Sequence, residues 1–122
     1  MILYASLLAA ALQTPGADWR PLHSTAEAQV SWDAAGVVRS GGTTTVRIRL
    51  TPLPAREGEN AYSISRVELR CTEHRARVAG TVNYASDGTE GERDISDIPF
   101  APIPPGSPFE LVRARVCPAA TH

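Results

Sequence analysis

Lysine is absent from this chain of 122 residues, so every basic residue in it is an arginine. Without a lysine amine the chain cannot form a Schiff base, and it lacks the lysine of a phosphate-binding P-loop. The formal net charge is −1, which argues against general binding to the phosphates of nucleic acids. No catalytic motif and no set of metal-spaced ligands is present. The sequence therefore predicts a protein that is not an enzyme and that has no catalytic residues, no bound metal and no cofactor.

Long apolar runs are also lacking. The longest covers residues 2–12, whereas a membrane-spanning helix needs roughly 20 apolar residues. A run of this length, with small residues such as Ala11 near its end and Ala17 after it, fits the apolar region of a signal peptide. We therefore expect residues 1–17 to be a signal peptide on a protein exported to the periplasm or the outer cell surface. A buried N-terminal helix is the alternative interpretation.

Cysteine is scarce, since only Cys71 and Cys117 are present. Two cysteines in a small exported domain usually pair, because oxidising compartments preserve disulfides. We expect a Cys71–Cys117 disulfide that joins the end of a strand to the end of a helix. The residues after it, 118–122, are expected to form a frayed tail.

Apolar and polar residues alternate in several short stretches, which is typical of strands with one buried face. In residues 43–50, for example, Val46, Ile48 and Leu50 are expected to face one way. Other strands are expected at residues 28–33, 37–40, 62–71 and 74–84, with a weaker strand or a loop at 89–98. Trp19, Val82 and Tyr84 are expected in the core. Short turns between these stretches predict an antiparallel meander of about five to six strands.

A single helix is expected after this meander. Ser107 is a suitable N-cap, and Glu110 is placed to bond back to the N–H of Ser107 in a capping box. Phe109, Val112 and Val116 form an apolar stripe at helical spacing. The predicted fold class is therefore α+β, with the helix packed on one face of the sheet and held by the disulfide.

These features resemble the surface-adhesin protein E-like family of exported Gram-negative envelope proteins. The similarity lies in residues 102–107 followed by Glu110 and Val116–Cys117, in residues 67–71, and in Tyr84 with Asp87–Gly88. Trp19 and residues 31–33 fit the N-terminal part of the family pattern. The resemblance implies a single domain over residues 18–117 that binds a host or matrix protein.

Arginines occupy polar positions in three of the expected strands. If these strands are neighbours, one face of the sheet carries Arg47, Arg49, Arg66, Arg70, Arg75 and Arg77. Guanidinium groups bind carboxylate or sulfate in a bidentate manner, so this face could bind an acidic protein or an anionic glycan. The alternative is a solvated face balanced by Glu68 and Glu73. In that case the protein is a periplasmic structural or accessory domain, with the possibility of a homodimer formed through an exposed sheet edge.

Overall fold

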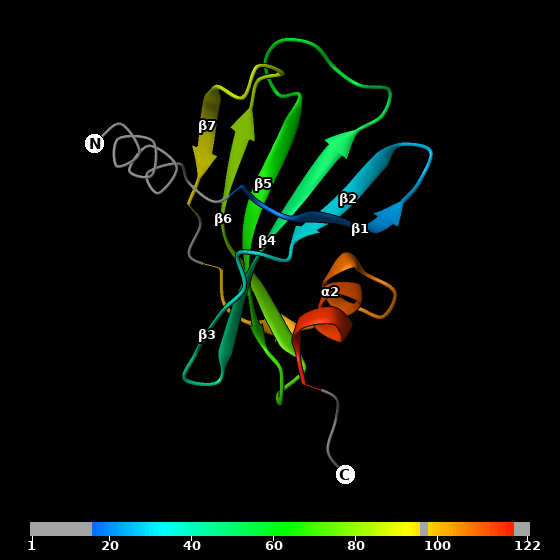
Figure 1. Cartoon of the computed structure of the whole chain (residues 1–122). Helices are drawn as coiled ribbons and strands as arrows, with labels where there is room; N and C mark the ends of the chain where they lie inside the picture. The colour runs from blue at the N-terminus through cyan, green and yellow to red at the C-terminus, as the bar shows by residue number, and fades with distance from the viewer. Residues whose placement is uncertain (1–15, 96–97, 119–122) are drawn as a thin grey trace, which may run out of the picture.

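Alternating apolar residues produce one antiparallel sheet, and the computed structural model shows a C-terminal helix against one of its faces (Figure 1). The structure describes residues 16–95 and 98–118. Most of the predicted signal peptide, residues 1–15, and most of the predicted tail, residues 119–122, lie outside the described residues. The prediction of an α+β fold with one C-terminal helix is confirmed.

The sheet has more strands than the sequence predicted. They are β1 (Trp19–Ser24), β2 (Ala28–Asp33), β3 (Val38–Ser40), β4 (Thr43–Pro52), β5 (Tyr62–Arg70), β6 (Arg75–Tyr84), β7 (Glu90–Asp94) and β8 (Ala101–Pro102). The order across the sheet is β1-β2-β4-β5-β6-β7, and all pairs are antiparallel. The short strands β3 and β8 pair with β4 and β6. The polar stretch at 89–98 thus contains an edge strand, β7.

The core lies between the sheet and the helix α2 (Pro108–Val116). Val46 and Val67 are directly opposite each other in β4 and β5, and both are buried. From the helix, Val112 and Val116 are buried against them, as the apolar stripe predicted. The face of the sheet opposite α2 carries no helix among the described residues, and we call it the outer face (Figure 1).

The N-terminus of α2 is capped by Ser107, as predicted. The Ser107 hydroxyl accepts a hydrogen bond from the N–H of Glu110 at 3.4 Å and donates one to the carbonyl of Pro104 at 2.7 Å. The expected capping box is wrong by one residue, because the Glu110 carboxylate accepts from the N–H of Gly106 instead. The N–H of Ser107 is already bonded to the Pro104 carbonyl in the preceding turn.

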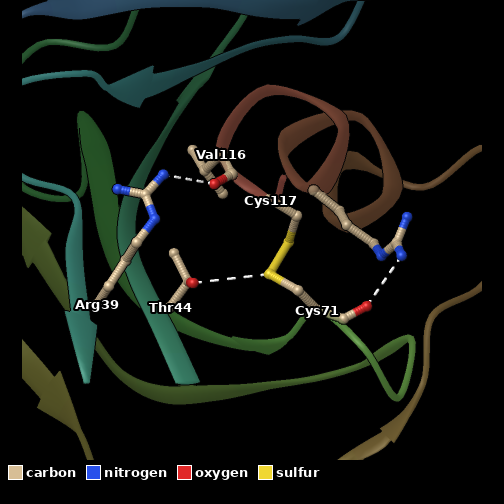
Figure 2. Close-up of a disulfide and its surroundings, with 6 residues drawn as sticks. Arg39, Thr44, Cys71, Val116 and Cys117 are labelled. Atoms are coloured by element: carbon tan, nitrogen blue, oxygen red, sulfur yellow. Dashed lines mark hydrogen bonds between the residues drawn. A yellow bond between two sulfur atoms is a disulfide. The ribbon is translucent and has the colours of Figure 1, made fainter. Parts of the chain in front are cut away.

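The C-terminal end of α2 is held to the sheet by the predicted disulfide between Cys71 and Cys117, whose Cα atoms are 5.6 Å apart (Figure 2). Further contacts surround it, and two of these come from strands of the sheet. Arg39 in β3 donates to the carbonyl of Val116 at 2.6 Å, and the Thr44 hydroxyl lies 3.6 Å from the Cys71 sulfur (Figure 2). The last turn of the helix is therefore fixed to both β3 and the end of β5.

A β-bulge in β6 reverses its side-chain alternation. Arg66 of β5 is opposite Gly80 and the next residue, Val67, is opposite Val78, so Ala79 is an extra residue without a partner. Because successive side chains alternate between faces, one extra residue moves all later ones to the other face. Val82 and Tyr84 therefore point to the outer face, and the prediction that they lie in the core is wrong.

Candidate functional site

The strand register places all six predicted arginines on the outer face. Arg47 of β4 is directly opposite Arg66 of β5, and Arg70 of β5 is directly opposite Arg75 of β6. Arg49 and Arg77 share their face, since each alternates with a residue of the buried face. Like charges directly opposite each other destabilise a sheet. Two such arginine pairs on one face therefore need another source of compensation.

Three of the six arginines have acidic partners. Arg47 pairs with Asp33 at 2.5 Å, Arg77 with Glu68 at 2.6 Å, and Arg70 with Glu73 at 3.7 Å. Within residues 16–95 and 98–118, no carboxylate pairs with the remaining three, which are Arg49, Arg66 and Arg75. The outer face is therefore only half balanced by the acidic side chains around it.

The part of the outer face next to β8 is covered by an aromatic ring. The guanidinium carbons of Arg70 and Arg77 lie 4.2 Å and 4.5 Å from the centroid of Phe100. A guanidinium over an aromatic face is stabilised by the ring quadrupole. Both arginines are thus engaged within the fold, and Arg75 beside them remains exposed.

At the other end of the outer face, Arg49 of β4 lies beside aromatic rings from β1 and β5, and a third ring from β6 stacks on the one from β5. The guanidinium of Arg49 lies 6.0 Å from the Trp19 ring and 4.1 Å from the Tyr62 ring, and Tyr62 stacks on Tyr84 with centroids 5.1 Å apart. Trp19 is opposite Asp33 at the end of β2, so it belongs to this face. The prediction that Trp19 is a core residue is wrong, because its strand places it on the side away from α2.

Asp33 is a buried carboxylate that holds one of the arginines in place. One of its oxygens, Oδ2, accepts two hydrogen bonds from Arg47, and the other accepts from the N–H groups of Asp18 and Ala35 at 2.9 Å and 3.0 Å. Burial by itself raises the pKa of Asp33, but the hydrogen bonds from Arg47 and the two backbone groups outweigh it and lower the pKa. Gly36 is needed here, since a Cβ at that position would lie 2.6 Å from the carboxylate.

A hollow of about 250 Å³ opens on the outer face beside the β6 bulge. Three arginines line it, namely Arg47, Arg66 and Arg93, together with the apolar surfaces of Ile64, Val82 and Tyr84. Gly80 contributes no side chain where it faces Arg66. Sequence reasoning missed this hollow, although a glycine inside a strand is a known signal of a bulge.

Metal and thiol chemistry find no support in the described part of the chain. It contains no group of three or more residues that could hold a metal ion, and both cysteines are in the disulfide. None of the described helices is long and apolar enough to cross a membrane. The outer face with its hollow is thus the feature with the most distinctive chemistry.

The sequence profile of a family described as surface-adhesin protein E matches residues 19–118. This range contains every element from β1 to α2 and both cysteines. Searches of curated proteins and of solved structures each gave no significant match.

Proposed function

Because this chain belongs to the surface-adhesin protein E family and is therefore an adhesin-like exported protein, we propose that it acts by binding an anionic ligand on its outer face. The ligand would be carried by a host or matrix protein or by an anionic glycan. In this proposal the protein needs no cofactor and catalyses no reaction.

The single observation that carries this proposal is the position of Arg66. Its side chain is exposed, it is directly opposite Arg47, and no carboxylate among the described residues pairs with it. Facing positive charges are unfavourable in a sheet; Asp33 offsets the charge of Arg47, and an anion bound at Arg66 would offset the other charge. A guanidinium also presents a planar set of donors that suits a carboxylate or a sulfate.

The end of the outer face next to β8 is a less suitable binding site than the region around Arg66. Arg70 and Arg77 both lie over Phe100, and both have acidic partners, so a ligand would have to displace contacts that the fold already makes. Arg49 also lies over a ring, that of Tyr62, but neither Arg49 nor the nearby Arg66 has an acidic partner among the described residues. We therefore assign binding to the part of the outer face around Arg66, away from β8.

Retention on immobilised heparin, used as a polyanionic probe, tests the proposal. We expect the wild type to be retained at low salt and released as salt screens the charges. The variant Arg66→Gln should elute at lower salt. The matched control Arg56→Gln removes an equal charge from an exposed position in the loop between β4 and β5. It should elute like the wild type.

Equal elution of both variants would contradict the proposal, because net charge alone would then explain retention. A wild type that is not retained and has the solution mass of a dimer would favour the accessory-domain interpretation. Melting curves of each variant confirm that the protein compared is folded.

The proposal includes export through a signal peptide at residues 1–17, which leaves a mature domain that begins before Trp19. N-terminal sequencing of the protein purified from the cell envelope tests this directly. A mature protein that still begins at Met1 in the cytosol would contradict it. Protease treatment of intact cells then separates a surface location, where the domain is cut, from a periplasmic one.

A further inference from the structure

A side chain at Gly80 would narrow the hollow beside the β6 bulge. The backbone of Gly80 is not in the left-handed region, and a Cβ there would meet only the carbonyl of Asp94 at 3.6 Å, an ordinary contact. Neither backbone strain nor a close approach therefore requires glycine at this position. What the glycine does is leave open the space between Arg66 and β7.

The floor of this space is apolar. Ile64 and Val82 are directly opposite each other on the outer face, and Tyr84 stands beside them. Ile95, which is 80% exposed, lies at the rim next to β7. Apolar surface of this kind gains free energy when an apolar group covers it.

Within the described part of the chain, the wall of the hollow provides one positive charge that has no acidic partner. Arg47 is engaged by Asp33, and Arg93 forms an ion pair with Glu90. Arg66 is the one lining arginine that has no acidic partner among the described residues. A single negative charge would thus be matched here, whereas a multiply charged group would find one guanidinium without an acidic partner among the described residues.

We propose that this hollow binds a single carboxylate that carries an apolar group. The carboxylate pairs with Arg66, and the apolar group lies over Ile64 and Val82. A volume of about 250 Å³ is below the range of about 300–1,000 Å³ for drug-sized ligands, so the group is small. This inference rests on the proposed function of the outer face and adds the chemical class of the ligand.

Two sources supply this chemistry, and three probes distinguish them in titrations followed by amide NMR shifts. Octanoate represents a free aliphatic acid. A tripeptide that ends in leucine with a free carboxylate represents the C-terminus of a protein, and the same tripeptide amidated at its C-terminus is the control. We expect octanoate, the free-acid tripeptide or both to shift the amides of Gly80 and Val82 saturably, and the amidated tripeptide to bind at least about tenfold more weakly.

Two variants test the two halves of the hollow separately. Arg66→Gln should weaken the binding of the carboxylate about tenfold, because a charge-assisted pair is lost. Gly80→Val should weaken binding at least about tenfold by occupying part of the hollow beside Arg66, although it leaves Arg66 in place and suits a strand. Arg75→Gln, on the same face but outside the hollow, should bind like the wild type. Melting curves of all three variants verify that they are folded.

The proposal is overturned if no probe shifts the amides of the hollow, or if the amidated tripeptide binds as well as the acid. It is also overturned if Arg66→Gln and Gly80→Val both bind normally. Heparin retention that depends on Arg66 while octanoate and the tripeptide acid fail to bind would leave the proposed function standing and refute this inference alone. Specific binding of a carboxylate without heparin retention would support the inference and reject a polyanionic ligand.

Discussion

Replacing Asp33 by asparagine tests the most connected polar group of the outer face. The carboxylate is 1% exposed and accepts four hydrogen bonds, two from Arg47 and one each from the N–H groups of Asp18 and Ala35. An asparagine can keep one carbonyl oxygen for the backbone groups, but its NH₂ would then face the donors of Arg47. The substitution therefore removes the charge and leaves two donors facing each other.

The expected loss follows from the burial of the two partners. Hydrogen bonds to a charged group contribute about 1.5–3 kcal/mol, and breaking a fully buried ion pair costs about 3–5 kcal/mol. The Arg47 side chain is 44% exposed, so water can replace part of what it loses. We expect Asp33→Asn to lower the free energy of unfolding by about 2–3 kcal/mol near neutral pH.

The loss should also depend on pH with a definite sign. The pKa of Asp33 is lower in the folded protein, so its carboxylate stabilises the fold above its unfolded pKa of about 3.9. That contribution disappears as the pH falls from about 4 through the lower folded pKa. The difference between wild type and Asp33→Asn should therefore be largest at about pH 7 and shrink in acid.

Urea melts of four proteins measure this effect: wild type, Asp33→Asn, Arg47→Gln and the double variant. Because the two side chains bond each other, the double variant should lose less than the sum of the single losses. Additive losses, or a loss from Asp33→Asn that is the same at about pH 7 and about pH 3, would refute the assigned role of this pair. A loss below about 0.5 kcal/mol at neutral pH would do the same.

Three further predictions concern the disulfide, the helix cap and the stacked arginines. Replacing Cys71 and Cys117 by serine should lower the free energy of unfolding by about 4 kcal/mol in urea melts, because the disulfide closes a loop between residues 46 apart in sequence. Ser107→Ala should cost about 0.5–2 kcal/mol and Ser107→Gly only a few tenths, and equal losses would argue against the cap. The double change Arg49→Ser with Arg70→Ser should lower stability by about 1–2 kcal/mol, since each guanidinium stacks on a ring at about 4 Å. Side-chain alternation alone predicts almost no change for exposed positions, so an unchanged melting temperature would contradict the stacking.

Local patterns in the sequence were sufficient for most of the architecture. The alternation of Val46, Ile48 and Leu50 places a strand because side chains in a strand repeat every two residues. The capping role of Ser107 could be predicted for a similar reason, since both partners of the bond lie within one turn. Two cysteines in a chain expected to be exported allow only one pairing within the chain, and the structure contains it.

The candidate site depended on tertiary structure. The extra residue Ala79 becomes visible only when β6 is aligned with β5, and it alone decides that Val82 and Tyr84 point to the outer face. The Asp33–Arg47 pair joins residues of two strands, and their spacing in sequence gives no sign of it. The sequence by itself determined most of the strands, the helix and the disulfide, because these follow from short-range periodicity and composition. The strand register decided which arginines have partners within the fold and where the outer face is hollow, because one unpaired residue changes the neighbours of every side chain that follows it.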